Sequence, residues 1–248
     1  MSDLMRWFGN RHPGAVEAVL SRAYGGERNP YEWLSRAVAR SADTVLDLAC
    51  GAGAMTERLE RPGRLVVGLD RSEKELAEAA SRGRGPLVLG HASYLPFADS
   101  CFDAVVTSLG VAVVADRPRF LTEVARVLRP GGVFAALTPS LRPVNVEDLR
   151  IVSRLAGYLR VNPHVPGITE FKAREALSSV GLTKAEDKRA KYYFEITGRE
   201  DAEVLMAGLR TTPDRGRALS AVEFLTARAE ASGPFRIPLP MRRIIAVK

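Results

Sequence analysis

Short apolar runs alternate with amphipathic stretches over the first 140 residues. Each run is rich in Val, Leu or Ala and too short for a helix, so it predicts a buried β-strand. The runs are 44–48, 65–69, 86–90, 102–108 and 133–138. Helices are predicted between them at 54–60, 72–81 and 117–128. Strands alternating with helices predict right-handed crossovers and a doubly wound, Rossmann-like, mostly parallel sheet with helices on both faces.

The pattern changes after residue 138. Residues 139–170 contain four prolines around one amphipathic stretch, 146–160, which predicts a helix. The apolar face expected for it holds Leu149, Val152, Leu155, Ala156 and Leu159. Further helices are predicted at 12–24, 30–40, 171–180, 200–209 and 214–231, and strands at 185–197 and 236–247. Seven strands and no long linker predict one domain over residues 1–248.

Charge and cysteine content narrow the class of protein. The 36 Lys and Arg against 29 Asp and Glu give a net charge of +7, spread along the chain without a block of like charges. This favours a solvated basic surface over a nucleic-acid-binding stripe. The two cysteines form no CxxC pair, so we expect no disulfide framework and no metal site, which fits a reducing cytoplasm. The apolar runs are too short for a membrane span, and the amino terminus lacks the apolar run of a signal peptide.

The segment TVLDLACGAG, residues 44–53, carries the first candidate site. An apolar strand ends near Asp47, and Gly51 and Gly53 allow a sharp turn into the next helix and a close ligand approach. That helix would present free N–H groups and the positive end of its dipole. A G-x-G alone is weak evidence, since many such turns use glycine for geometry only.

Two carboxylates decide which ligand suits this turn. Asp70 follows the second predicted strand, where a carboxylate suits the two hydroxyls of a ribose. Thr56 stands where a dinucleotide fingerprint has its third glycine, and Asp47 would repel a pyrophosphate but attract an ammonium group. These charges favour an adenosine that carries an amino acid over NAD.

Four segments in order resemble the class I S-adenosylmethionine-dependent methyltransferases, in the broad group related to ubiquinone and menaquinone biosynthesis. VLDLACGAG resembles the first motif of the family and VVGLDRS the second. GHASYLPFADSCFDAVVTSLGV resembles the third motif with the following strand, and LTEVARVLRPGGVFAALTP the helix and turn before the fifth strand. The resemblance covers residues 44–139, whereas the flanking regions match only in general layout.

The resemblance implies S-adenosylmethionine as cofactor and S-adenosylhomocysteine as product. Asp47 with the backbone of Ala49, Gly51 and Gly53 would hold the methionine end, and Asp70 the ribose, with Arg71 and Ser72 beside it. Ala92 and Ser93 would face the adenine, and Ser108 and Leu109 would lie under the sulfonium. The family commonly has Asp where this chain has His91, so the acidic contact with the adenine amino group is in question. A neutral His can also accept a hydrogen bond.

The acceptor is less defined than the cofactor. A general base is needed only when the acceptor must lose a proton, and the weak candidates are His164 and His12. The segments 1–40, 139–170 and 199–235 are expected to form a lid and roof over a small-molecule acceptor beside the core 41–138. Arg142, Arg150, Arg154 and Arg160 could bind an anionic group or form a solvated helix surface. Two alternatives remain open, an RNA methyltransferase and a non-catalytic S-adenosylmethionine-binding protein; the sequence sets no oligomeric state.

Overall fold

The fold is taken from a computed structural model that describes residues 13–25, 28–140, 142, 145–159, 170–209 and 215–248. The chain divides into two compact units. The first contains residues 1–30, 140–164 and 190–240, and the second contains residues 31–139, 165–189 and 241–248. None of the described helices is long and apolar enough to cross a membrane.

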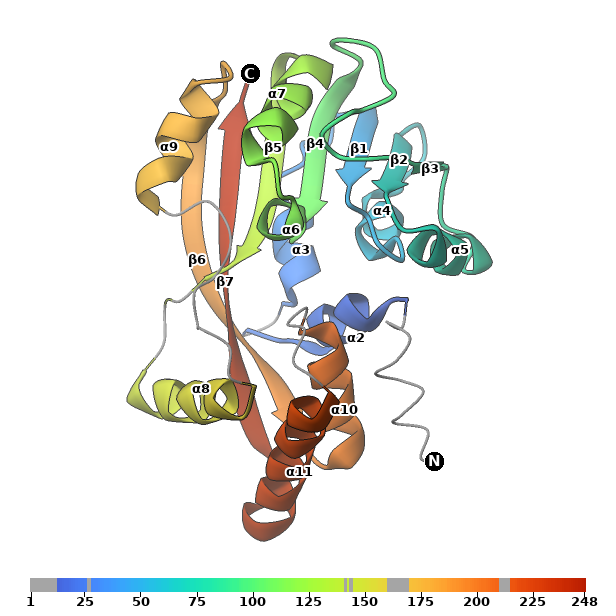
Figure 1. The fold of residues 1–248 in the computed structure, drawn as a ribbon. Helices are drawn as coiled ribbons and strands as arrows, with labels where there is room; N and C mark the ends of the chain where they lie inside the picture. The colour runs from blue at the N-terminus through green and yellow to red at the C-terminus, as the bar shows by residue number, and fades with distance from the viewer. Residues whose placement is uncertain (1–12, 26–27, 141, 143–144, 160–169, 210–214) are drawn as a thin grey trace. The chain divides into compact units, whose positions relative to one another are not determined.

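The predicted seven-stranded, mostly parallel sheet is confirmed (Figure 1). Its strand order is β3-β2-β1-β4-β5-β7-β6. The strands are β1 (Thr44–Leu48), β2 (Leu65–Asp70), β3 (Leu87–Leu89), β4 (Phe102–Ser108), β5 (Leu128–Pro139), β6 (Thr183–Ile196) and β7 (Phe235–Val247). Strands β1 to β5 pair in parallel, and β7 runs antiparallel to β5. Strands β6 and β7 contain residues of both units.

The second unit owes its core to strands that are covered on both faces. Val45, Leu46 and Leu48 of β1 are fully buried, which explains why the strand reads as a continuous apolar run. In the register of the sheet Asp47 lies beside Gly68 of β2 and Val106 of β4. The carboxyl ends of β1, β2 and β4 therefore meet at one edge.

Four helices of the second unit follow the predicted positions closely, whereas a short helix after β4 was not predicted and the helix at 30–40 is shorter than expected. The helices of this unit are α3 (Pro30–Ser35), α4 (Ala54–Leu59), α5 (Glu73–Ser81), α6 (Gly110–Val113), α7 (Arg117–Val127) and α9 (Glu170–Ser178). Side chains cap two of them: Ser72 accepts from the backbone N–H of Glu75 in α5, and Asp116 from that of Arg119 in α7. Helices α7 and α9 lie side by side on one face of the sheet (Figure 1).

The predicted helix 30–40 is shorter than expected. Helix α3 ends at Ser35, and the chain continues through turns in which Ala37 and Val38 donate to carbonyls three residues before them. The guanidinium of Arg64 donates to the carbonyls of Ala39 and Ala42, both at 2.8 Å. A side chain from a distant part of the sequence thus satisfies carbonyl groups that helical pairing would otherwise occupy.

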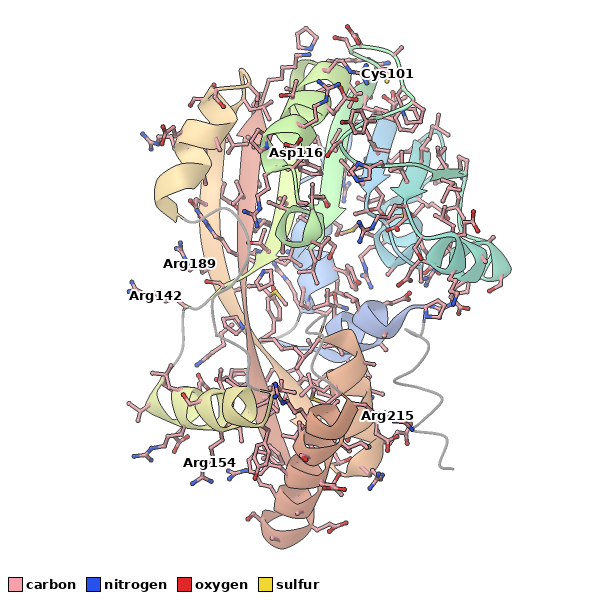
Figure 2. The ribbon with its side chains drawn as sticks, in the orientation of Figure 1. Cys101, Asp116, Arg142, Arg154, Arg189 and Arg215 are labelled. Atoms are coloured by element: carbon pink, nitrogen blue, oxygen red, sulfur yellow. The ribbon has the colours of Figure 1, made fainter. Side chains whose placement is uncertain are left out.

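The first unit has its own core around α2 (Ala15–Arg22), α8 (Val146–Leu159), α10 (Arg199–Gly208) and α11 (Arg215–Ser232). The predicted apolar face of α8 is wrong at Leu149, which is 50% exposed, whereas Asp148 is buried. Asp148 accepts from the backbone N–H of Asn145 and from the Lys191 ammonium, so its burial is compensated by hydrogen bonds. Arg142, Arg150 and Arg154 are exposed, and Figure 2 shows Arg154 projecting from α8; Arg160 lies outside the described residues.

Asp103 ties β4 to β1 at the amino ends of both strands. Its Oδ2 accepts from the backbone N–H groups of Asp43 and Thr44, at 2.9 and 2.8 Å, and from the Thr44 hydroxyl. Burial alone would raise the pKa of this carboxyl, but these bonds and the Arg129 guanidinium outweigh burial and lower the pKa to about 2. Asp103 therefore stabilises the fold as a carboxylate.

We expect Asp103→Asn to lower the free energy of unfolding by about 1.5–3 kcal/mol at neutral pH, because charge-assisted hydrogen bonds are lost. A depressed carboxyl pKa stabilises the folded state above about pH 4, and that contribution disappears as the pH falls toward about 2. Urea unfolding at neutral pH and near pH 3 checks this. A difference between the two proteins that does not shrink at the lower pH would contradict the assignment.

Candidate cofactor site

The turn after β1 bends through left-handed backbone conformations. Gly51 and Gly53 have φ of 56° and 82°, and Ala49 has φ of 60° although it carries a Cβ. The N–H of Cys50 donates to the Leu69 carbonyl, and that of Gly53 to the Cys50 carbonyl, at 3.0 Å each. A non-glycine residue held in this region stores strain of about 1–3 kcal/mol, and such strain clusters at functional sites. Helix α4 is only six residues long, so the turn itself rather than a helix dipole is the feature of interest.

Asp47 is a fully buried carboxyl at the end of β1. The Thr56 hydroxyl donates to its Oδ2 at 2.7 Å, while Oδ1 is buried without a partner among the described residues. Burial raises the pKa of Asp47 to about 7, against the opposing effect of the hydrogen bonds from Thr56. A buried carboxyl with one unused oxygen is a poor neighbour for a phosphate and a suitable one for a cation.

Thr56 explains how the turn works without a third glycine. A Cβ added at Gly68 of β2 would lie 3.0 Å from both the Thr56 hydroxyl and the Cys50 sulfur. The strand therefore carries the glycine that lets helix α4 pack closely, and the helix position is free for a side chain that bonds Asp47. This partner of Asp47 is not predictable from the spacing of the motif.

Asp70 ends β2 and faces the same turn. Its Oδ2 accepts from the Gly51 N–H and its Oδ1 from the Ser72 N–H, both at 2.9 Å. The side chain thus joins the ends of β1 and β2 and orients the loop that starts α5. Each carboxylate oxygen retains a further lone pair for a ligand hydroxyl.

The end of β4 adds two further polar atoms. The hydroxyl oxygens of Thr107 and Ser108 are buried without partners among the residues described. Leu109, which follows, has φ of 64°. A Cβ at Gly110 would collide with the Thr107 hydroxyl and lie 3.1 Å from the Ala49 Cβ. The ends of β1 and β4 therefore approach closely here; Ser108 and Leu109 were predicted for this place, Thr107 and Gly110 were not.

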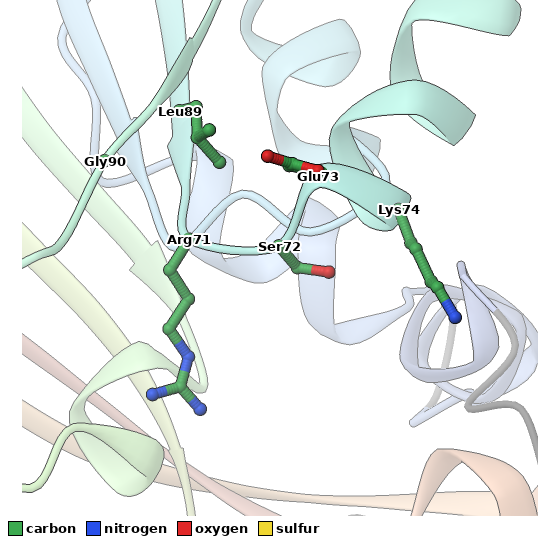
Figure 3. A pocket seen from close by; sticks show the side chains of 6 residues that line it. All are labelled: Arg71, Ser72, Glu73, Lys74, Leu89 and Gly90. Atoms are coloured by element: carbon green, nitrogen blue, oxygen red, sulfur yellow. The ribbon is translucent and has the colours of Figure 1, made fainter.

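The loop after β3 brings the predicted adenine-side residues to the same edge. The Gly90 N–H donates to the Asp70 carbonyl at 2.9 Å, which anchors the loop beside β2. Ala92 and Ser93 are buried, whereas His91 is exposed. A pocket of about 470 Å³ opens next to this loop, and Figure 3 shows Arg71 and Lys74 extending away from Leu89 on either side of Ser72. Its lining residues are Arg71, Ser72, Glu73, Lys74, Leu89 and Gly90.

The predicted catalytic candidates are not part of this site as described. His12 and His164 both lie outside the described residues. Burial raises the pKa of the Cys50 thiol, helped by the nearby carboxylates Asp47 and Asp70, so Cys50 is not an activated nucleophile. The described site thus holds carboxylates, hydroxyls and a strained turn, which suit binding more than proton transfer.

Comparison with known proteins agrees with this geometry. Residues 46–136 match the family Methyltransf_11, described as a methyltransferase domain. The chain is 47% identical over 126 residues to the demethylmenaquinone methyltransferase of Mycobacterium bovis, covering 48% of this chain and 53% of that protein. It is 50% identical over 91 residues to the enzyme of the same name from Mycolicibacterium gilvum, covering 37% and 40%. Residues 46–136 match a methyltransferase domain.

The fold of the chain is also found among solved structures. A protein from Bacillus halodurans C-125, assigned as a methyltransferase, superposes with a TM-score of 0.62 at 19% identity, covering 88% of this chain and 98% of that one. At this identity the likeness shows the fold alone. The chain spans only 40–53% of the length of the two curated relatives.

Proposed function

We propose that the chain transfers a methyl group from S-adenosylmethionine to a small-molecule acceptor. The observation that carries this proposal is Asp47, a buried carboxyl with one partnerless oxygen beside a strained glycine turn. An α-ammonium group would satisfy that oxygen and compensate the buried charge. The residues present therefore fit the amino-acid end of the cofactor.

The remaining contacts follow from what each residue offers. Asp70 would accept from the ribose hydroxyls through its spare lone pairs, while its bonds to Gly51 and Ser72 hold it in place. Ala92 and Ser93 would border the base, with Arg71 alongside. Ser108 and Leu109 would lie nearest the reacting methyl group.

The cofactor supplies an activated methyl group, whose bond to sulfur breaks as the bond to the acceptor forms, leaving a neutral thioether. The residues of the site have to orient this group toward the acceptor and exclude water. Asp47 and Asp70 fix the two ends of the cofactor, and the buried hydroxyls of Thr107 and Ser108 provide polar atoms near the β4 end. A base is required only when the acceptor loses a proton, so an acceptor that is already ionised needs none.

A quinone-like aromatic acceptor is the first candidate. The demethylmenaquinone methyltransferases are named for such an acceptor. We propose further that segments 1–40, 139–170 and 199–235 select the acceptor, because they lie outside the matched methyltransferase domain, residues 46–136. A chain in which residues 139–170 are exchanged for the corresponding segment of a relative should keep its cofactor affinity while its acceptor preference changes.

Methyl transfer can be measured directly. The full chain is incubated with S-adenosylmethionine labelled in the methyl group and with separate acceptors: a reduced demethylated naphthoquinone, a panel of phenols and amines, and total RNA. We expect label in a small molecule. Label in RNA that falls steeply with salt would favour the RNA methyltransferase. Cofactor binding without transfer to any acceptor would favour the non-catalytic binder.

Nicotinamide cofactors are expected not to bind. Asp47 would stand against the pyrophosphate, and Thr56 closes the space that the third glycine of a dinucleotide fingerprint leaves open. A fluorescence titration with NADH and NADPH is predicted to show no saturable signal at concentrations up to about 1 mM, the upper end of ordinary enzyme affinities. Saturable binding in the micromolar range would overturn the interpretation of the glycine turn.

A further inference from the structure

The turn at residues 91–95 is held rigidly from several sides. The Tyr94 N–H donates to the His91 carbonyl at 2.9 Å, and the Leu95 N–H donates to the Glu123 carboxylate at 2.7 Å. The Arg119 guanidinium donates to the Ser93 carbonyl at 3.3 Å. Helix α7 thus fixes the backbone of the loop that carries His91.

One hydrogen bond decides which nitrogen of the His91 ring accepts and which donates. The Ser93 N–H donates to His91 Nδ1 at 3.1 Å. The opposite ring orientation would place a C–H group against this N–H and lose the bond. A neutral imidazole has one acceptor nitrogen and one N–H, so an Nδ1 that accepts leaves Nε2 as a donor. His91 is therefore a donor toward anything outside the turn.

An aspartate at this position would behave differently. Its side chain can accept from the N–H two residues ahead, as in an Asx turn, and still offer a second oxygen as an acceptor. His91 keeps the same local turn, but its only acceptor is consumed by Ser93. Histidine in place of aspartate therefore preserves the backbone turn, but the side-chain atom that faces outward is a hydrogen-bond donor and not an acceptor.

We propose that His91 presents Nε2–H to an acceptor nitrogen of the cofactor's purine ring, so that this site does not recognise the 6-amino group through residue 91. The inference rests on the proposed function, because it requires the base to lie beside the loop 91–95. The ring nitrogens of adenine are acceptors, whereas its amino group is a donor that Nε2–H cannot satisfy. The site then tolerates a purine without the amino group.

Calorimetry with two ligands tests this. S-adenosylhomocysteine is compared with its purine riboside analogue, in which hydrogen replaces the 6-amino group and the ring nitrogens remain. For the wild-type chain we expect dissociation constants within about threefold of each other, since no hydrogen bond to residue 91 is lost. A preference of about tenfold or more for the amino-bearing ligand overturns the proposal.

His91→Asp and His91→Asn form a matched pair of nearly equal size. Either side chain can accept from Ser93 N–H, but Asp then presents an acceptor outward and Asn presents its NH₂ donor. We expect Asn to resemble the wild type and Asp to prefer the amino-bearing ligand by about ten- to a hundredfold. Equal ratios in the two variants would contradict the proposal, while wild-type binding of S-adenosylhomocysteine would leave the proposed function intact.

A spectroscopic measurement covers the case in which a variant fails to fold. The ¹⁵N chemical shifts of the His91 ring in the wild-type chain distinguish a protonated Nε2 from a protonated Nδ1. A protonated Nε2 in the neutral ring supports the proposal, and a protonated Nδ1 overturns it. Failure of the wild-type chain to bind S-adenosylhomocysteine is a different result, because it contradicts the proposed function itself.

Discussion

Replacing Asp70 with alanine is expected to weaken binding of S-adenosylhomocysteine by about ten- to a hundredfold, equivalent to about 1.5–3 kcal/mol. Two effects combine. The variant loses the proposed bonds to the ribose hydroxyls, and it leaves the buried N–H of Gly51 without its carboxylate partner. Titration calorimetry measures the affinity. Asp70→Asn keeps an acceptor oxygen but no charge, so its affinity should lie between those of the wild-type chain and Asp70→Ala.

Asp103→Asn is the matched control for this experiment. Asp103 also accepts backbone N–H groups and joins neighbouring strands, but it lies at the amino ends of β1 and β4. Its replacement should reduce stability and leave the affinity for S-adenosylhomocysteine unchanged. An unchanged affinity in Asp70→Ala, or an equal loss in both variants, would remove Asp70 from the ribose contact.

The second large effect concerns Asp47 and pH. Because burial raises the pKa of Asp47 to about 7, this carboxyl is protonated in the free protein at lower pH and must ionise to pair with an ammonium group. Affinity for S-adenosylhomocysteine should therefore rise with pH, approaching tenfold per unit below about pH 7 and levelling above it. The ligand's own α-ammonium group stays protonated over this pH range, so the rise belongs to the protein.

The variant Asp47→Asn tests whether Asp47 causes this pH dependence of the affinity. The variant should bind with an affinity that changes little between about pH 5.5 and about pH 7.5, and the loss of affinity against wild type should be largest at the upper end.

The stability of the free protein depends on pH in the opposite direction, because the folded state holds a proton on Asp47 that the unfolded state releases above about pH 4. The contribution of Asp47 to stability therefore falls as the pH rises through about 7. A flat wild-type binding profile would contradict the ammonium contact.

The sheet and the position of its carboxylates were predictable because they follow from local patterns. Fully buried parallel strands read as unbroken apolar runs, and the βαβ connection places the ends of successive strands on one edge. Asp47 and Asp70 were thus expected at the same edge, and the structure joins them through the glycine turn. The family motifs lie in residues 44–139, where the strands predicted from the apolar runs match the strands of the sheet.

Other features depend on contacts between distant residues and could not be predicted in this way. Arg64 caps the carbonyls after α3, and Lys191 allows Asp148 rather than Leu149 to be buried on α8. Neither partner is visible from the periodicity of its helix. The polarity of His91 is a third case, because residue type permits an acceptor and only the bond from Ser93 excludes it.

Titration calorimetry of the wild-type chain with S-adenosylhomocysteine tests the central claim most directly. We expect one saturable site per chain with a dissociation constant in the micromolar range. The affinity should increase as the pH is raised toward neutrality, and NADH should give no heat of binding under the same conditions. Absence of saturable binding to the folded chain at concentrations up to about 1 mM would contradict the assignment of the turn, Asp47 and Asp70 as a cofactor site.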